Sequence, residues 1–185
     1  MVTAEASQKL HKLHDELRGA LKQYPDFPQP GIIFEDILPL FSSFEVHTKL
    51  VDALVLQVIE AFPSKPDVIV GLDARGFLFG PTLALKLEAG FVPVRKRGKM
   101  PGDCVSEKYV KEYGEDWFEM QKDVIKPGQK VLVVDDIIAT GGSASAAGSL
   151  VRQLEGDLLG YLFILELDFL KGRDKLDAPV ITLLH

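Results

Sequence analysis

The chain has 185 residues, of which 46% are hydrophobic and 26% charged, so it is long enough to bury the core of one globular domain. Its 27 acidic and 21 basic residues give a formal net charge of −6, which argues against nucleic-acid binding through bulk electrostatics. Apolar runs fall far short of the roughly 20 residues that a membrane-spanning helix needs, and the amino terminus shows no export signal. A single cysteine, Cys104, favours a reducing compartment. We therefore expect one domain over residues 1–185, in the cytoplasm.

The amino-terminal quarter of the chain predicts two packing helices separated by a stiff segment. Four leucines recur at three- and four-residue spacing and predict a helix that ends near Tyr24-Pro25; they are Leu10, Leu13, Leu17 and Leu21. Residues 25–31 contain three prolines and a glycine, so we expect an irregular segment that leads into Ile32 to Phe34. A second amphipathic helix is expected from His47 to Phe62.

The rest of the chain alternates short apolar runs with helical patterns. Strands are predicted at Val68 to Leu72, Val92 to Val94, Val131 to Val134, Tyr161 to Leu167 and Val180 to Leu184. Helices are predicted at Phe79 to Glu88 and Ser143 to Glu155. Several of the strands lack polar alternation, as in strands covered on both faces. The pattern predicts an α/β fold with a mostly parallel central sheet flanked by helices.

One segment, Arg97 to Glu119, interrupts this alternation. It is polar, it contains Gly98, Pro101, Gly102 and Gly114, and it is too long for a simple connection. We expect it to form a functional flap or hairpin.

Two loops follow predicted strands and are candidates for ligand binding, because ligands of parallel α/β sheets lie beyond the carboxyl ends of the strands. The first spans Gly71 to Gly76. The second, Ala139 to Ser143, is called the glycine-rich loop below; its glycines allow close backbone approach, and its N–H and hydroxyl groups suit a monophosphate. The alternative is an ordinary strand-to-helix turn in which Ser143 caps the helix. The sequence contains neither G-x-x-x-x-G-K-S/T nor G-x-G-x-x-G, which excludes the two common nucleotide-binding fingerprints.

The longer stretch VVDDIIATGGS, Val133 to Ser143, resembles the phosphoribosyl diphosphate signature of type I phosphoribosyltransferases, in which two acids and two apolar residues precede A-T-G-G-T/S. The similarity extends over nearly the whole chain to the adenine-specific members of that family, through DFPQPGIIFEDILPLF, VGLDARGFLFGP, FVPVRKRGKMPG, KEYG and ELDFLKGRDKL. It implies the type I phosphoribosyltransferase fold, with an amino-terminal hood at about residues 24–45 and a flexible flap at about residues 97–119. It also implies a purine-salvage enzyme that transfers the phosphoribosyl group of 5-phosphoribosyl 1-diphosphate to adenine, giving AMP and diphosphate.

The resemblance assigns the ribose phosphate end of the substrate to one stretch. The glycine-rich loop, Ala139, Thr140, Gly141, Gly142 and Ser143, would bind the 5-phosphate. Asp135 and Asp136, called the acidic pair below, would accept hydrogen bonds from the 2- and 3-hydroxyls. A Mg²⁺ ion would lie near the acidic pair but would be held through the substrate, with no direct protein ligand.

Cationic side chains would hold the diphosphate. Arg75 matches the family's diphosphate loop and would also approach the purine, although a solvated arginine is the plain alternative. Arg95, Lys96, Arg97 and Lys99 form a local basic cluster. A surface patch for RNA is the other interpretation of this cluster, and the negative net charge argues against it. In similar enzymes some of these cations come from the neighbouring subunit, which implies a homodimer.

The resemblance also implies the residues that select and activate adenine. Ile33, Phe34 and Leu167 match adenine-contacting positions, and backbone groups of Ile33 and Glu35 would read the ring edge. Several family members have arginine where Glu35 stands, so only a backbone role is expected there. Phe34 and Leu167 could also be ordinary core. Glu112 and Tyr113, in KEYG, match the family's candidates for proton handling and loop closure.

Three other functions are compatible with parts of the sequence. VLVVDD also resembles the first acidic strand of signalling receiver domains, but a receiver needs roughly a hundred residues after it and only 49 follow Asp136. A regulator that binds the ligand without turnover would use the same fold. Another base specificity, for hypoxanthine, guanine or xanthine, is the third.

Overall fold

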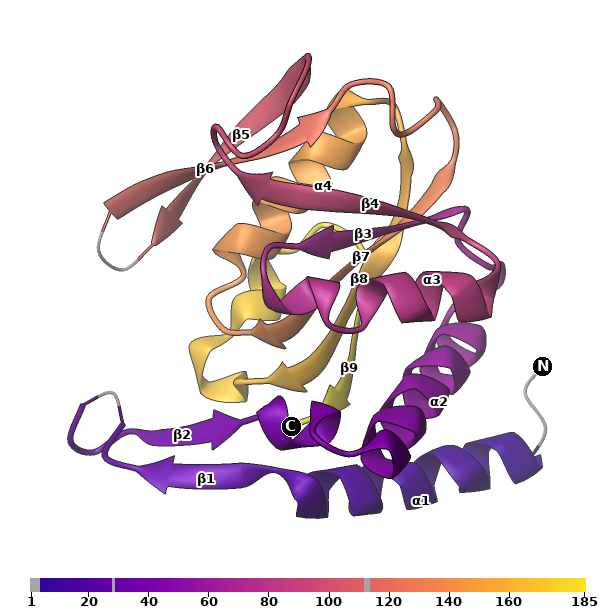
Figure 1. Cartoon of the computed structure of the whole chain (residues 1–185), viewed down its shortest axis with the longest axis vertical. Coiled ribbons are helices and arrows are strands. Elements are labelled where there is room, and N and C mark those ends of the chain that lie inside the picture. Colours follow the sequence, from indigo (N-terminus) through magenta and orange to yellow (C-terminus); the bar gives the residue numbers. More distant parts are fainter. Residues whose placement is uncertain (1–3, 28, 112–113) are drawn as a thin grey trace. The chain divides into compact units, whose positions relative to one another are not determined.

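The computed structural model describes residues 4–27, 29–111 and 114–185, so that Glu112 and Tyr113 lie outside the described residues. The chain divides into two compact units, residues 1–60 and residues 61–185 (Figure 1).

The amino-terminal unit contains two helices and a short hairpin. Its elements are α1 (Ala4–Ala20), β1 (Lys22–Pro25), β2 (Ile33–Asp36), the 3₁₀ turn η1 (Leu38–Phe41) and α2 (Phe44–Ala61). The expected apolar stripe of α1 is buried at Leu10, Leu13 and Leu17. An ion pair between Glu16 Oε2 and Lys49 Nζ, 2.9 Å apart, links the two helices.

The first helix was predicted to be too long. It ends at Ala20, and residues 22–25 instead pair antiparallel with β2, from Lys22 opposite Asp36 to Pro25 opposite Ile33. Proline has no backbone N–H and disrupts a helix interior, so a helix is not favourable close to Pro25. Pairing with β2 gives the backbone groups of residues 22–25 hydrogen-bond partners instead. Of the described residues of the stiff segment, 26, 27 and 29–31 lie outside helices and strands as predicted, whereas Pro25 belongs to a strand.

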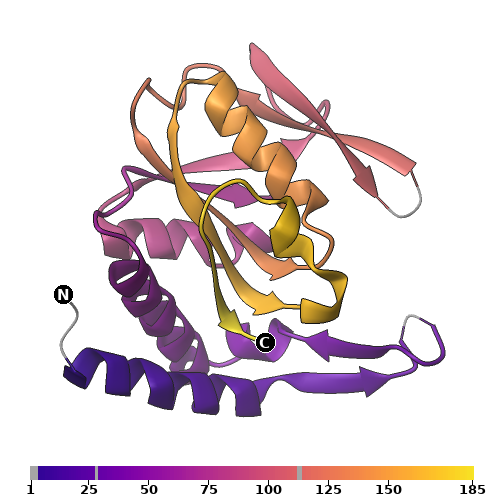
Figure 2. The same ribbon diagram turned by 180° about the vertical axis from the view of Figure 1, so that it is seen from behind.

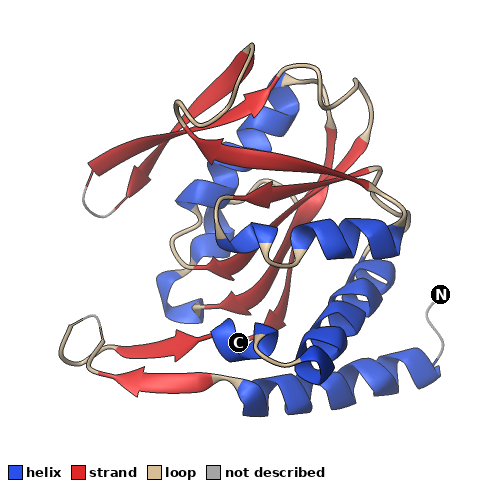
Figure 3. Cartoon of the chain, in the orientation of Figure 1, coloured by secondary structure: helices blue, strands red, loops and turns tan. Residues whose placement is uncertain are grey.

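The second unit is built on one sheet of seven strands (Figures 1 and 3). They are β3 (Val68–Leu72), β4 (Gly90–Lys96), β5 (Cys104–Lys111), β6 (Gly114–Gln121), β7 (Lys130–Ile138), β8 (Asp157–Glu166) and β9 (Val180–Leu184). The spatial order is β5-β6-β4-β3-β7-β8-β9. The strands from β4 to β9 in this order run parallel, and the β5–β6 hairpin joins the edge through antiparallel pairing of β6 with β4. The expected mostly parallel sheet is confirmed, and the segment expected to be a flap or hairpin contains this hairpin except for its last two residues, 120 and 121.

Helices cover both faces of the sheet. α3 (Gly80–Leu87) and α4 (Gly142–Gln153) lie on opposite faces, as the views from front and back show (Figures 1 and 2). Three 3₁₀ turns complete the unit: η2 (Arg75–Phe77), η3 (Asp168–Leu170) and η4 (Gly172–Lys175). In the part of the chain that the structure describes, no helix combines the length and apolarity needed to cross a membrane.

The strand β7 is longer than the sequence predicted. The apolar run was expected to end at Val134, but parallel pairing with β8 continues to Ile138 opposite Glu166, so both acids lie within the strand. Backbone pairing decides where a strand ends, and the polarity of its side chains does not override it. Because β3 and β7 are parallel neighbours, the loops at their carboxyl ends leave the same edge of the sheet.

Two leucines on α3 test the assignment of the core. Leu83 is 0% exposed and Leu85 is 80% exposed. We expect Leu83→Ala to lower the free energy of unfolding by about 2–5 kcal/mol, because it removes buried apolar volume and leaves a cavity. Leu85→Ala, the matched control, should change it by about 0.5 kcal/mol or less. Chemical denaturation of both variants is the measurement, and comparable losses in the two would contradict the described exposure of α3.

Candidate active site

A pocket of about 180 Å³ lies at the carboxyl edge of the sheet, where the loops after β3 and β7 meet. Its lining is largely polar and comes from three sources: Arg75 of η2, Phe163 of β8, and the continuous stretch from Asp135 to Ala144. Two motifs separated by some sixty residues in sequence, the loop after β3 and VVDDIIATGGS, thus line one pocket, as parallel pairing of β3 with β7 requires.

The acidic pair lies at the end of β7, within the pocket lining. Asp136 is 3% exposed, and the backbone N–H of Asp136 donates to Asp135 Oδ1 over 2.9 Å. Burial, followed by the negative charge of Asp136, raises the pKa of Asp135 well above its usual range. Two adjacent carboxylates, of which that of Asp136 is buried, repel each other, so this end of the strand favours a cation or hydroxyl donors beside it.

Arg75 supplies one cation to the acidic pair. Its Nε lies 2.6 Å from Asp136 Oδ2, although 49% of the arginine side-chain surface is exposed. Asp136 Oδ2 is nevertheless buried without a partner of hydrogen-bond geometry. The contact is therefore an ion pair that leaves hydrogen-bonding capacity on the carboxylate and donor groups on the guanidinium.

The glycine-rich loop ends in the start of α4. Gly141 takes the left-handed conformation, with φ of 77°, and precedes the first helical residue, Gly142. Ser143 is the second residue of this helix, and no side chain caps the helix. The alternative of an ordinary strand-to-helix turn capped by Ser143 is therefore wrong in its capping residue. The first N–H groups of a helix have no acceptor within the helix and, with the helix dipole, attract an anion. The loop thus presents free backbone donors to the same pocket as the acidic pair.

The basic cluster lies outside the described lining of the pocket. Arg95, on β4, donates from Nε to Asp73 Oδ2 over 3.1 Å and from Nη1 to the carbonyl oxygen of Lys99. Lys96 Nζ is 3.9 Å from Asp116 Oδ2, and Lys99 is exposed in the turn that follows β4. Asp73, which sequence reasoning did not single out, therefore balances the charge of Arg95.

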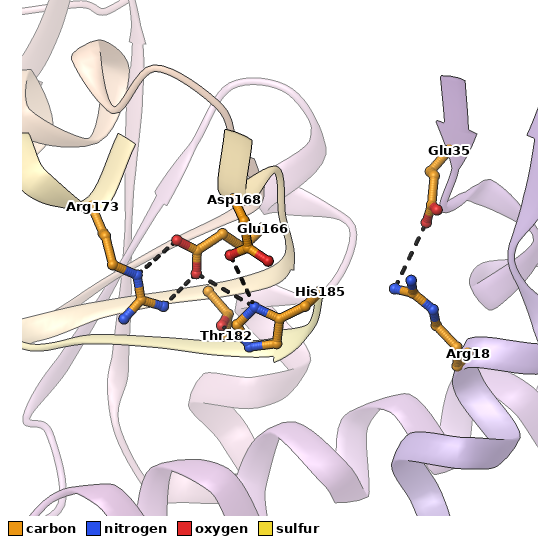
Figure 4. Close-up of polar contacts among 7 residues, drawn as sticks. All are labelled: Arg18, Glu35, Glu166, Asp168, Arg173, Thr182 and His185. Carbon is orange, nitrogen blue, oxygen red and sulfur yellow. Dashed lines mark hydrogen bonds and ion pairs between the residues drawn. The ribbon is translucent and has the colours of Figure 1, made fainter. Parts of the chain in front are cut away.

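The three residues expected to read adenine from the amino-terminal unit lie on β2. Ile33 is 64% exposed, and Phe34 packs edge to face on Phe27 with ring centroids 5.2 Å apart. Glu35 accepts a hydrogen bond from Gln23 Nε2 over 2.9 Å and forms a longer ion pair with Arg18, at 3.9 Å (Figure 4). Phe34 is thus part of a small aromatic contact on the hairpin, and the Ile33 side chain is largely free of the unit's own core.

Leu167 directly follows β8, and its N–H donates to the carbonyl oxygen of Ile138 at the end of β7. Next to it, Glu166 is 4% exposed and accepts hydrogen bonds on both carboxylate oxygens from Arg173, one of them from Nε over 2.7 Å (Figure 4). These bonds hold the pKa of the Glu166 carboxyl below its usual range. The carboxylate therefore stays ionised and paired, and the loop after β8 is fastened at its start.

A group of three side chains in this region could in principle hold a metal ion. Among the described residues, Glu166, Asp168 and His185 place potential ligand atoms within 4.8 Å of one another. Arg173 already donates to both oxygens of Glu166, and His185 Nδ1 lies 3.3 Å from Asp168 Oδ1 (Figure 4). The guanidinium thus supplies the positive charge that a metal would bring, and we assign no metal to this group.

Sequence reasoning missed this Glu166–Arg173 pair, although both residues lie in the ELDFLKGRDKL stretch. An acid at the end of a strand and a base seven residues later in the following loop carry no periodic signal, unlike the i, i+4 pairs of a helix. The role of Asp73 could not be read from the sequence either, because its partner Arg95 comes from the next strand. Glu112 and Tyr113 lie outside the described residues, so their assignment stays a prediction.

Comparison with known proteins gives the chain relatives over almost its whole length. The family model described as the phosphoribosyl transferase domain matches residues 44–162. The chain is 63% identical over 171 residues to adenine phosphoribosyltransferase 1 of Saccharomyces cerevisiae, covering 92% of this chain and 91% of that protein. It is 61% identical over 176 residues to adenine phosphoribosyltransferase of Yarrowia lipolytica, covering 95% and 97% respectively.

A solved structure agrees with these relatives. The crystal structure of the Saccharomyces cerevisiae enzyme, complexed with D-2,5-dideoxy-2,5-imino-altritol 1,6-bisphosphate and adenine, superposes with a TM-score of 0.91 at 62% identity. The match covers 94% of this chain and 99% of that one. With the backbone fold and the sequence agreeing over this length, the chain belongs to the adenine phosphoribosyltransferases, within the family of phosphoribosyl transferase domains.

Proposed function

We propose that the protein is a purine-salvage transferase that makes AMP and diphosphate from adenine and 5-phosphoribosyl 1-diphosphate. One observation of the structure carries this conclusion: the acidic pair and the free start of α4 line the same pocket. A ribose 5-phosphate needs both, because its phosphate requires donors and its diol requires acceptors. A site for phosphate alone would gain nothing from two carboxylates beside it.

The reaction forms a bond between N9 of adenine and C1 of the ribose, and it breaks the bond between C1 and the diphosphate oxygen. The backbone donors of the glycine-rich loop would hold the 5-phosphate, while the acidic pair accepts hydrogen bonds from the 2- and 3-hydroxyls. Arg75 and the basic cluster would stabilise the negative charge that builds on the leaving diphosphate. Adenine loses the proton of N9, and we propose Glu112 as the group that receives it, with Tyr113 closing over the site.

Magnesium fits the residues present. The acidic pair offers carboxylate oxygens, the ligand type that Mg²⁺ prefers, and the buried Asp136 Oδ2 faces Arg75 in an ion pair without hydrogen-bond geometry. A Mg²⁺ ion bound with the substrate would neutralise part of the diphosphate charge beside this carboxylate. We propose that the ion is held mainly through substrate oxygens, with the acidic pair nearby.

Recognition of the base, assembly and location complete the proposal. We propose that Ile33, Phe34 and Leu167 contact adenine and that backbone groups of Ile33 and Glu35 read its edge. We further propose that residues 1–185 act as one domain, with a hood at about 24–45 and a flap at about 97–119, and that the protein works as a cytoplasmic homodimer. Relatives at about 60% identity that carry the name adenine phosphoribosyltransferase support adenine as the base.

A panel of bases tests the proposed reaction. Incubated with 5-phosphoribosyl 1-diphosphate and Mg²⁺, the protein should convert adenine to AMP, while hypoxanthine, guanine and xanthine should give little or no nucleotide. A site that hydrogen-bonds one pattern of ring substituents rejects the mismatched base, because its polar groups would lose their partners. Chromatographic separation of nucleotides is the measurement. Product from another base alone would refute the adenine assignment, and no product from any base would leave a regulator that binds without turnover.

Neutralising the acidic pair tests its role. Asp135→Asn with Asp136→Asn should raise the KM for 5-phosphoribosyl 1-diphosphate by roughly 10- to 100-fold, since a hydrogen bond to a charged acceptor is worth about 1.5–3 kcal/mol. Steady-state kinetics with this substrate varied is the measurement. Asp123→Asn, an exposed aspartate after β6, is the control for the change in charge. Unchanged turnover and affinity in the double variant would remove the acidic pair from the site.

The proton-handling role assigned to Glu112 has its own test. Glu112→Ala should lower kcat by about 100-fold or more while leaving the KM for both substrates within about threefold, as removal of a general base does. Glu115→Ala, which removes an exposed acid of the same hairpin, should leave kcat within about twofold of the unaltered protein. A loss in affinity with unchanged kcat would instead make Glu112 a binding residue.

A further inference from the structure

Two glycines far apart in the sequence press their backbones together beside the pocket. Gly172, the first residue of η4, is buried, and a Cβ placed on it would overlap the carbonyl oxygen of Ala139 and lie 2.9 Å from the backbone nitrogen of Gly141. A Cβ placed on Gly141 would overlap the carbonyl oxygen of Gly172 in turn. Neither position has room for a side chain, and the atoms that would be struck belong to the backbone and cannot rotate away.

This contact joins the glycine-rich loop to the loop after β8. Residues 167–179 connect β8 to β9 and are called the β8–β9 loop here. Leu167 N–H donates to Ile138 at its start, and Gly172 meets Ala139 and Gly141 at its middle. The β8–β9 loop therefore lies against the backbone of the glycine-rich loop at Ala139 and Gly141.

An ion pair fastens the β8–β9 loop in this place. Arg173, directly after Gly172, donates through two nitrogens to the buried carboxylate of Glu166, the last residue of β8 (Figure 4). Bidentate pairing fixes the direction of the guanidinium as well as its distance. Glu166 is in register with Ile138 of β7, so the pair anchors the turn to the same strand end from which the glycine-rich loop begins.

We propose that Gly172 and Arg173 are positioning residues for the 5-phosphate: the Glu166–Arg173 pair holds the backbone of Gly172 against Ala139 and Gly141 and so fixes the donors of the glycine-rich loop. Neither residue needs to touch the substrate. Backbone donors stabilise an anion best when their directions are set before it arrives, because no energy is then spent on ordering them. The inference rests on the proposed function, since it concerns how the loop assigned to the 5-phosphate keeps its shape.

Gly172→Ala is the direct test. The new methyl group must displace the Ala139 carbonyl, and we expect the KM for 5-phosphoribosyl 1-diphosphate to rise about tenfold or more, with kcat and the KM for adenine within about threefold. Gly90→Ala is the matched control, because a Cβ there would meet its nearest neighbour, the Asp67 carbonyl oxygen, at an ordinary 3.8 Å. A folded Gly172→Ala variant with an unchanged KM for this substrate would overturn the proposal.

The ion pair is tested separately, because removing Arg173 alone leaves Glu166 buried and unpaired and could unfold the protein. The double variant Glu166→Gln with Arg173→Gln removes both charges, and we expect it to fold and to show the same selective rise in KM, about fivefold or more. Lys175→Gln removes an exposed cation from the same turn and should have no such effect. A folded double variant with the KM of the unaltered protein would refute the role of the pair, and so would equal losses in the affinities for both substrates.

Binding of ribose 5-phosphate, measured by calorimetry without adenine, separates this inference from the reaction itself. Weaker binding to Gly172→Ala than to Gly90→Ala would support the positioning role even if the unaltered protein made no AMP. Production of AMP by the unaltered protein, together with equal ribose 5-phosphate binding by the two variants, would refute the positioning role and leave the proposed reaction standing.

Discussion

Parallel pairing of β7 with β3 on one side and β8 on the other is the constraint on which the candidate site depends. It brings the carboxyl ends of three strands to one edge of the sheet. From those ends come Arg75 after β3, the acidic pair and glycine-rich loop on and after β7, and Leu167 after β8. A single backbone arrangement thus collects groups that are separated by more than ninety residues of sequence, as expected for ligand sites of parallel α/β sheets.

The charge arrangement at this edge is close to balanced before any ligand binds. Asp136 is buried against Arg75, Asp73 is paired with Arg95, and Glu166 is paired with Arg173. Buried charges are tolerated when they are paired in this way. A substrate that carries both anionic and hydroxyl groups can exchange partners with such pairs. This exchange is easier than the removal of water from isolated ions. The protein's net charge of −6 therefore does not prevent a local affinity for a highly anionic substrate.

Much of the fold could be predicted from the sequence because its signals are local. The limits of β3 and β9 agree with their apolar runs, since flanking residues end the runs where the pairing also ends. The prediction failed at β1, which a leucine stripe had assigned to α1, and at β7, which passes through two acids. In both cases the deciding partner is another strand, β2 or β8, and the sequence of one segment carries no record of its partner.

The same distinction applies to the candidate site. The motif from Val133 to Ser143 contains its own turn chemistry and was recognisable, whereas Asp73, Glu166 and Arg173 act through partners elsewhere in the fold. Gly172 is the extreme case, because its requirement is space for the backbone of Ala139 and Gly141, some thirty residues earlier.

The contact between Gly172 and Gly141 also limits how the β8–β9 loop of this scaffold can be exchanged. Exchanging the β8–β9 loop for that of a relative would transplant the surroundings of Leu167, but the graft would remain compatible with this glycine-rich loop only if a glycine arrived at position 172 with the same backbone direction. In a saturation library, positions 141 and 172 should both reject every residue larger than glycine, because a side chain at either one would overlap the backbone of the other loop. The part of the β8–β9 loop that tolerates exchange is therefore shorter than the loop itself.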